Sequence, residues 1–207
     1  MIETKEPSQH HHGNLKQALI DYALKAARDG ALEELSLRKA SRDLGVSTGA
    51  AYRHFNDRDS LLQTVAQRGF DMLADQFEAT LPFNSRAKDR AEARNRFTGL
   101  ATAYLRFSQD HTNLWRLMFG PYGLVPQSES NRPSTYDWLG KSLQELAQFG
   151  LIRTPDRSAQ FFAWTSIHGL SDLASSPAAA SQLAEDLVST HCAFMLNALA
   201  PNDTIGL

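Results

Sequence analysis

Apolar residues recur every three to four positions along almost the whole chain, and no convincing alternating stretch interrupts them. This period predicts helices and no sheet. The first helix is expected after Asn14, a suitable N-cap, and before Gly30, a suitable C-terminal residue. One face of this helix would be formed by Leu15, Ala18, Leu19, Tyr22, Ala23, Ala26 and Ala27.

Residues 36–55 have the pattern of two short helices joined by a tight turn. Ser36 and Ser47 can each cap a helix, and Gly45 suits a left-handed turn position between them. The second helix begins at Thr48 and is expected to run for about two turns, with small residues at its head. A short helix with a small, polar head fits the major groove of duplex DNA. The pattern therefore predicts a DNA-binding helix-turn-helix, although a tight pair of core helices can produce the same pattern.

The remaining apolar periodicity predicts six more helices. A fourth helix, capped at Asn56-Asp57, is expected to reach a break at residues 81–83. The others are expected at residues 87–110, 111–119, 138–149, 155–174 and 178–199, with a proline- and serine-rich loop at 120–133. The prediction is an all-α chain of about nine helices. Its N-terminal three-helix domain would occupy residues 14–60, after a flexible arm at 1–13, and a C-terminal helical bundle domain residues 61–207.

Composition excludes several classes of protein. The chain is 42% hydrophobic, which excludes a disordered protein. No apolar run is long enough to span a bilayer, and the first residues do not resemble a signal peptide. Cys192 is the single cysteine, so no internal disulfide can form, and a reducing cytoplasm is the expected location.

The net charge of −2 is unevenly distributed. Residues 1–119 hold 17 Lys and Arg against 15 Asp and Glu, whereas residues 120–207 hold 4 against 8. Residues 38–58 carry five basic side chains and only two acidic ones. A local basic patch of this kind is sufficient for a compact DNA site, and pairing two copies doubles it.

Neither a metal site nor an enzyme site is expected. His10, His11 and His12 are a weak ligand set, because no Cys or carboxylate converges on them in the sequence. There is no Glu-x-x-His pair and no glycine-rich phosphate loop. His191 and Cys192 are adjacent, which places them on different sides of a helix, a poor geometry for a nucleophile and its base. We therefore predict no cofactor and no catalytic residue.

The stretch from His11 to Leu62 resembles the DNA-binding domain of the tetracycline-repressor (TetR) family. The resemblance is carried by Leu-Gly-Val-Ser at 44–47, Tyr-Arg-His-Phe at 52–55, Asp-Arg-Asp at 57–59 and Leu61-Leu62. Ala40-Ser41 and Arg58 depart from the usual residues but keep their size or charge. The likeness favours a native arm, rather than a tag, for the histidines.

Further residues resemble the TetR branch whose C-terminal domain is named for a Trp-His-Gly set. They are residues 103–107, His111, residues 114–120, Trp164, and His168 with Gly169 and Leu170. The resemblance implies a pocket for a small-molecule effector, for which the candidates are Phe107, Trp115, Phe119, Trp164 and His168. Each aromatic side chain would also suit a plain core, and His168 could instead satisfy a buried hydrogen bond, with Asp172 as the partner one turn later.

The helix-turn-helix assigns roles to individual residues. Tyr52 would bind a phosphate, with Thr48, His54 and Arg58 as further backbone anchors, unless Tyr52 is a core aromatic under the helix. Arg38 and Arg53 would reach base edges. Gly49 and Ala50 would allow close approach to DNA. The residues assigned to the core are Leu37, Ala40, Leu44, Val46 and Phe55.

The last two predicted helices have apolar residues on more than one face. We expect two such hairpins to pair as a homodimer, although both faces could instead be buried within one chain. A dimer would read a near-palindromic operator with half-sites ~34 Å apart. The overall prediction is a ligand-responsive regulator, and a repressor because the family mostly represses; operator position decides between repression and activation. The alternative is a helical dimeric scaffold without specific DNA binding.

Overall fold

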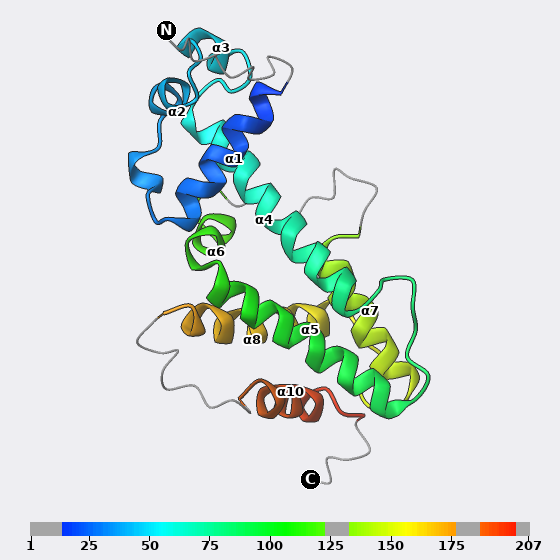
Figure 1. The fold of residues 1–207 in the computed structure, drawn as a ribbon. Helices are drawn as coiled ribbons and strands as arrows, with labels where there is room; N and C mark the ends of the chain where they lie inside the picture. Colours follow the sequence, from blue (N-terminus) through cyan, green and yellow to red (C-terminus); the bar gives the residue numbers. More distant parts are fainter. Residues whose placement is uncertain (1–13, 123–132, 177–186, 202–207) are drawn as a thin grey trace, which may run out of the picture. The chain divides into compact units, whose positions relative to one another are not determined.

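The computed structural model describes residues 14–122, 133–176 and 187–201. These residues form nine α-helices and one short 3-10 helix, η1, and contain no strand (Figure 1). The prediction of an all-α chain is therefore confirmed. The elements are α1 (Leu15–Arg28), η1 (Leu32–Glu34), α2 (Leu37–Asp43), α3 (Thr48–Tyr52), α4 (Arg58–Thr80), α5 (Arg90–Asp110), α6 (Thr112–Phe119), α7 (Thr135–Gln148), α8 (Arg157–Ala174) and α10 (Leu187–Ala198).

The chain divides into two compact units, with the division between Val65 and Ala66. The domain boundary predicted from the sequence, between residues 60 and 61, lies slightly earlier in the same helix, α4. Three predicted features lie outside the described residues: the arm at 1–13, most of the loop at 120–133 and the start of the last predicted helix.

The first unit is held together by α1, α2 and α3, which pack on one another (Figure 1). The prediction of core positions is confirmed for Leu37, Ala40 and Phe55, which are buried. Leu44 and Val46, also assigned to the core, are only half-buried, because they lie at the turn where α2 ends. The buried residues that complete this core are Leu19, Ala23, Ala27, Ala51, Leu61 and Leu62.

The turn between α2 and α3 has the predicted geometry. The Ser36 hydroxyl accepts a hydrogen bond from the Lys39 amide at 3.1 Å, and the Ser47 hydroxyl accepts one from the Ala50 amide at 3.3 Å. Gly45 has φ +70°, a conformation that favours glycine. Asn14 occupies the predicted N-cap position of α1, but its side chain makes no capping hydrogen bond.

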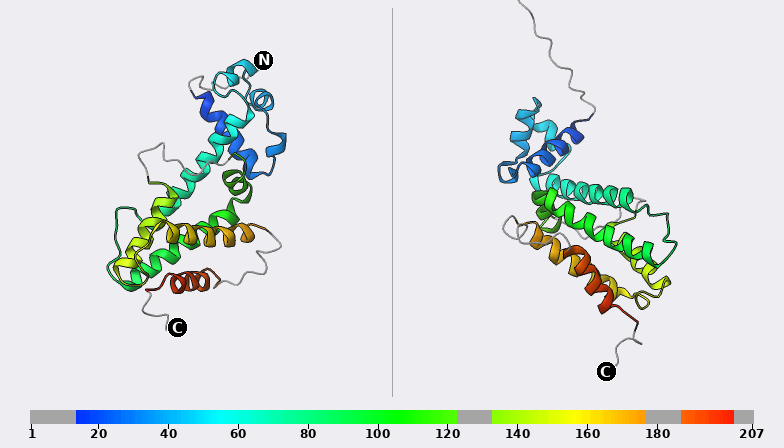
Figure 2. Two further views of the ribbon diagram at one scale, coloured as in Figure 1. Left: turned by 180° about the vertical axis from the view of Figure 1, so that it is seen from behind. Right: turned by 60° about the horizontal axis from the view of Figure 1, so that its bottom comes forward.

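The second unit is organised around α5, which contacts α6, α7, α8 and α10. Both views of Figure 2 show α8 beside α10. Trp115 and Trp138 are fully buried, and the Trp138 indole nitrogen donates to the Leu81 carbonyl at 3.1 Å. None of the described helices combines the length and apolar character that crossing a lipid bilayer requires.

A buried ion pair joins α5 to α7. Arg96 donates from Nε to Glu145 Oε2 at 2.8 Å and from Nη2 to Oε1 at 3.2 Å. Arg96 Nη1 also donates to the Ser85 hydroxyl at 2.9 Å, and Lys141 donates to the carbonyls of Phe83 and Ser85. Burial lowers the pKa of Lys141. These bonds fix the α4–α5 loop against α7.

Candidate functional site

The surface around α3 is polar and open. Tyr52, Arg53 and His54 are exposed, as are Gly49 and, at the start of α2, Arg38. Tyr52 keeps 45% of its surface accessible, so the alternative of a core aromatic under the helix is wrong. The helix is shorter than predicted: it has five residues and ends at Tyr52, so that Arg53 and His54 follow its last turn.

Gly49 has no packing reason to be glycine. A Cβ atom built at this position would meet nothing within 4 Å, and its φ is not positive. Thr48 and Ala50, on either side, are half-buried. The absence of a side chain at Gly49 therefore affects only the outer surface of α3 and is not required by the packing of the core.

The basic side chains near α3 differ in their partners. Lys39 lies 3.8 Å from Glu34, and Arg42 lies 3.8 Å from Asp43, both as exposed pairs of the kind that contribute little to stability. Within the described part of the chain, Arg38 and Arg53 have no side-chain hydrogen bond or ion pair. These two cations are thus available to an external anion.

Arg58, a predicted phosphate anchor, makes contacts inside the first unit. Its Nε donates to the Leu35 carbonyl at 3.1 Å and its Nη2 to the Leu32 carbonyl at 2.9 Å. The planar guanidinium suits two carbonyl oxygens, and so ties the start of α4 to the η1 segment. Sequence spacing gave no signal for this contact, because the partners lie 26 and 23 residues earlier.

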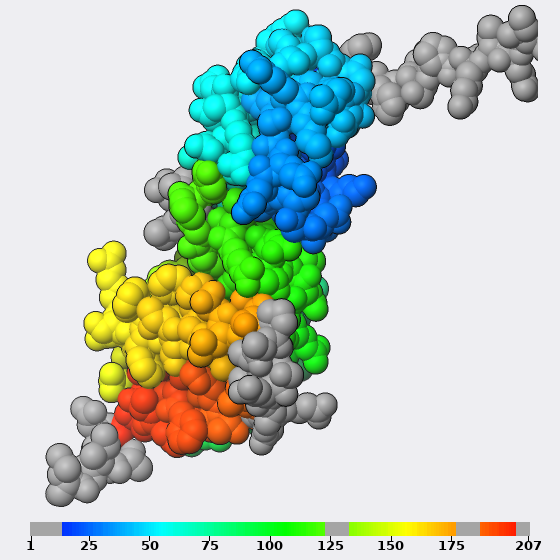
Figure 3. Space-filling view, turned by 90° about the vertical axis from the view of Figure 1, so that its left-hand side faces the viewer, coloured from blue at the N-terminus to red at the C-terminus, as the bar shows by residue number. Residues whose placement is uncertain are grey.

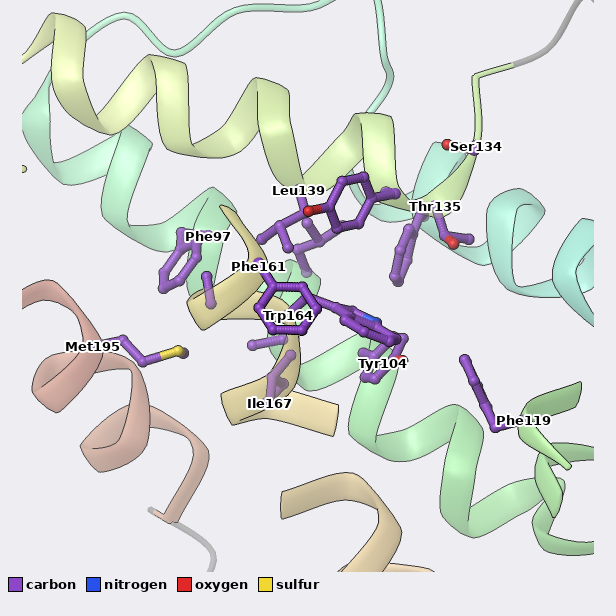
Figure 4. A pocket seen from close by; sticks show the side chains of 15 residues that line it. Phe97, Tyr104, Phe119, Ser134, Thr135, Leu139, Phe161, Trp164, Ile167 and Met195 are labelled. Atoms are coloured by element: carbon purple, nitrogen blue, oxygen red, sulfur yellow. The ribbon is translucent and has the colours of Figure 1, made fainter. Parts of the chain in front are cut away.

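The second unit contains a cavity of about 380 Å³. Its wall comes from α4, α5, α6, α7, α8, α10 and Ser134, the N-cap of α7. Thirteen of the fifteen lining residues are aromatic or aliphatic, and the other two are Ser134 and Thr135. Figure 4 shows Phe161 and Trp164 in the middle of this wall, with Met195 on one side and Phe119 on the other.

The five residues predicted for the effector site occupy different positions. Phe119 and Trp164 line the cavity. Phe107 and Trp115 are fully buried in the core and are not part of its wall. His168 lies behind the wall, stacked between Trp115 at 5.2 Å and Trp164 at 5.4 Å, with interplanar angles of 28° and 26°.

Tyr104, which the sequence analysis did not single out for the site, joins the cavity wall to His168. Its hydroxyl lies 3.0 Å from His168 Nδ1, so the partner of His168 is Tyr104 and not Asp172, the candidate one turn later on α8. Burial raises the pKa of Tyr104 far above its usual range, opposed by a hydrogen bond from the Trp164 side chain. Burial also lowers the pKa of His168, opposed by the charge of Asp172. Both groups are therefore uncharged at neutral pH.

The outer faces of α8 and α10 are apolar and exposed. Phe162, Leu173 and Phe194 keep 41%, 65% and 69% of their surfaces accessible, so they are not buried within the chain. Figure 3 shows α8, in yellow to orange, directly beside α10, in red. The Ser166 hydroxyl and His191 Nε2, 2.9 Å apart, link the two helices. The exposed side of these two helices, with Phe162, Leu173 and Phe194, is called the α8–α10 face.

Other chemical groups give no further site. In the described ranges, no three His, Cys, Asp or Glu side chains are grouped so that they could hold a metal ion. Cys192 is buried, and burial raises the pKa of its thiol to about 11, opposed by a hydrogen bond with Thr98. A thiol with such a pKa is a poor nucleophile.

The exposed helix-turn-helix and the separate helical unit with an apolar cavity define a helix-turn-helix protein of the two-unit, all-helical class. Residues 97–198 match the family model described as the tetracyclin repressor-like C-terminal domain. The second unit is therefore assigned to the tetracyclin repressor-like C-terminal domain family.

Individual relatives agree with this assignment. An HTH-type transcriptional regulator of Staphylococcus aureus is 30% identical over 63 residues, which are 30% of this chain and 34% of that protein, so the match spans about a third of its length. A protein of unknown function from Rhodococcus sp. RHA1 is 27% identical, with a TM-score of 0.75 over 94% of this chain and 100% of that one. A putative tetR family regulator from Shewanella sp. PV-4 shares the fold, with 17% identity and a TM-score of 0.65 over 90% and 98%.

Proposed function

We propose that this protein is a homodimeric, sequence-specific DNA-binding regulator, and a repressor that a small molecule releases from a near-palindromic operator. The observation that carries the proposal is the surface of α3, where exposed Tyr52 and Arg53 lie beside a glycine that packing does not require. An open surface with two unpaired arginines and a glycine in its first turn can approach a polyanion closely.

Each residue of this surface has a proposed role. Arg38 and Arg53, which have no partner among the described residues, would contact base edges. The Tyr52 hydroxyl, Thr48 and His54 would contact phosphates, while Gly49 and Ala50 would bring the backbone close to the groove. Arg58, which ties α4 to the η1 segment, would be a further phosphate anchor.

The α8–α10 face supports the homodimer. A single α3 of five residues makes too few contacts to select a site, so two copies are needed. Phe162, Leu173 and Phe194 are exposed in the single chain, and pairing two α8–α10 faces about a two-fold axis would bury them. The four helices would then form a bundle.

The cavity supports the response to a ligand. Its size and apolar lining fit a small-molecule pocket. Release of the operator requires that the ligand bind two conformations of the protein unequally. We propose that the difference lies in the position of α4, which contributes Phe77 to the cavity wall and also begins in the first unit at Arg58. The further assignment to the Trp-His-Gly branch rests on Trp164, His168 and Gly169.

The test is selection of bound sequences from a random pool of DNA duplexes, with Arg53→Ala in parallel and Arg28→Ala, an exposed arginine of α1, as the matched control. The proposal predicts a near-palindromic motif that Arg53→Ala relaxes at one symmetric position and Arg28→Ala leaves unchanged. Affinity should fall with increasing salt. A pool without enrichment at low salt would contradict specific DNA binding and favour the scaffold alternative.

A further inference from the structure

We propose that the cavity of the second unit takes an uncharged, aromatic effector and rejects organic anions and cations of the same shape. The ligand's role as an effector rests on the proposed function.

The first argument is the absence of charge from the wall. None of the fifteen described residues that line the cavity is Asp, Glu, Lys or Arg. A carboxylate, sulfonate or ammonium group loses its hydration on entering such a cavity and finds no opposite charge there to replace it. An uncharged molecule carries no such cost.

Second, two hydroxyl groups of the wall already have hydrogen-bond partners. The Tyr104 hydroxyl is bonded to His168 Nδ1 at 3.0 Å, and the Ser134 hydroxyl accepts from the Asp137 amide at 3.2 Å within the cap of α7. The His168 ring stacks on Trp115 and on Trp164, and it is not among the residues that line the cavity.

The third argument is the number and arrangement of rings. Seven of the lining residues are aromatic. Trp164 stacks on His168, which leaves its opposite face or its edge for the cavity. The rings of Phe161 and Tyr136 lie 5.9 and 6.4 Å from Trp164, at angles of 54° and 85°. Rings inclined around a free indole surface form a slot that suits a further flat ring in stacked and edge-to-face contacts.

A matched pair of fluorescent probes tests the charge argument. N-phenyl-1-naphthylamine is uncharged, and 8-anilinonaphthalene-1-sulfonate has the same rings with an added sulfonate. We expect the full-length protein to bind the uncharged probe at least tenfold more tightly. The cation (1-naphthylmethyl)trimethylammonium should fail to displace it. Equal or tighter binding of the sulfonate, displacement by the cation, or no binding of the uncharged probe would overturn the inference.

Two variants assign the binding to the cavity. Ala101→Phe fills it from α5, and Ala91→Phe places the same ring on the exposed start of that helix as a control. Trp164→Ala, at a half-buried position, removes the stacking surface and is the second test should Ala101→Phe not fold. Affinity for the uncharged probe should fall at least tenfold in Ala101→Phe and Trp164→Ala and not in Ala91→Phe. Unchanged binding in folded Ala101→Phe or Trp164→Ala would overturn the inference.

These titrations contain no DNA, so their outcome is independent of the operator assay. Loss of probe discrimination with intact operator binding would contradict the ligand class alone. Tight binding of the uncharged probe by a protein that selects no DNA sequence would contradict the proposed function and leave the ligand class standing.

Discussion

The ring of Phe119 meets the ring of Phe70 edge to face, with centroids 5.3 Å apart and an interplanar angle of 83°. Phe119 ends α6 and lines the cavity, whereas Phe70 is buried on α4. Beside them, a Cβ atom on Gly69 would lie 2.5 Å from the sulfur of Met118, so α4 and α6 are in close contact. A change in the cavity at Phe119 is therefore felt directly by α4.

Phe70→Leu should weaken the coupling between ligand and operator without weakening ligand binding. The variant removes the ring contact with Phe119 but leaves the cavity wall intact, because Phe70 does not line it. N-phenyl-1-naphthylamine should bind as tightly as before, while its effect on operator affinity should fall severalfold. Phe97→Leu, a wall residue, is the control and should show the reverse. A full effect on operator affinity in Phe70→Leu would show that this contact does not carry the coupling.

Gly49→Leu should separate folding from DNA binding. Nothing lies within 4 Å of the new Cβ, and replacing a helical glycine should raise the free energy of unfolding by about 0.5 kcal/mol. The bulky side chain should nevertheless lower operator affinity by about tenfold or more, a loss of ~1.4 kcal/mol, because it holds the helix away from the groove. Denaturant titration and a DNA-binding assay measure the two effects. Unchanged operator affinity would mean that α3 does not enter the groove as proposed.

Glu145→Ala should lower the free energy of unfolding by about 3 kcal/mol, because it removes one partner of a buried ion pair. The change leaves the guanidinium of Arg96 buried without its bidentate partner. Urea unfolding of this variant, of Arg96→Met and of the double variant measures the coupling, and the double variant should recover part of the loss. Glu33→Ala, at an exposed position, should stay within about 0.5 kcal/mol of the parent protein. Additive losses in the double variant would argue against the pair.

Stability should decrease below about pH 6.5 because of His168 and His191. Burial holds the pKa of each below the unfolded value of 6.5, so the unfolded chain takes up protons first as the pH falls. The stabilisation is complete above pH 6.5 and is lost as the pH falls toward the folded pKa. Unfolding free energies between pH 5.5 and 8 should show a smaller slope in His168→Gln and His191→Gln. Slopes equal to that of the parent protein in both variants would exclude these two histidines as the cause.

Leu173→Glu should convert the proposed homodimer into a monomer of 23.0 kDa. The side chain is 65% exposed in the single chain, so a carboxylate there costs little until two α8–α10 faces meet and desolvate it. Light scattering after size exclusion measures the mass of the variant. A DNA-binding assay should show that the monomer binds the operator more weakly than the parent protein. Ala91→Glu, on an exposed part of α5, is the control. A dimeric Leu173→Glu would place the interface elsewhere.

Local sequence signals predicted the helix-turn-helix well, because its geometry depends on neighbouring residues. Ser36, Gly45 and Ser47 each act within three or four residues, and the structure has each in the predicted role. Asn14 is the N-cap residue of α1, as predicted on the same reasoning, but its side chain makes no capping hydrogen bond. The length of α3 was overestimated, because the sequence pattern predicted about two helical turns from Thr48, whereas the helix ends at Tyr52.

Contacts between distant residues were not predictable from the same signals. His168 was given Asp172 as a partner because the two are one turn apart, whereas the hydroxyl that it meets belongs to Tyr104, 64 residues away. Arg58 was assigned to phosphate from its place next to the helix-turn-helix, whereas its bonds to the η1 segment depend on tertiary packing. The cavity combines side chains from six helices, which no single periodicity reveals.

The buried bonds of Arg96 and Lys141 give the cavity two unlike sides. On α7, Leu139 belongs to a helix that these bonds clamp to α5 and to the α4–α5 loop. On α6, Phe119 has ring contacts to Phe70, Tyr104, Trp115 and His168. A bound ligand therefore contacts a rigid wall at Leu139 and a more easily displaced side chain at Phe119. Lengthening a ligand by one methyl group should displace Phe119 rather than Leu139. The potency of an effector should therefore change with its length in the direction of Phe119.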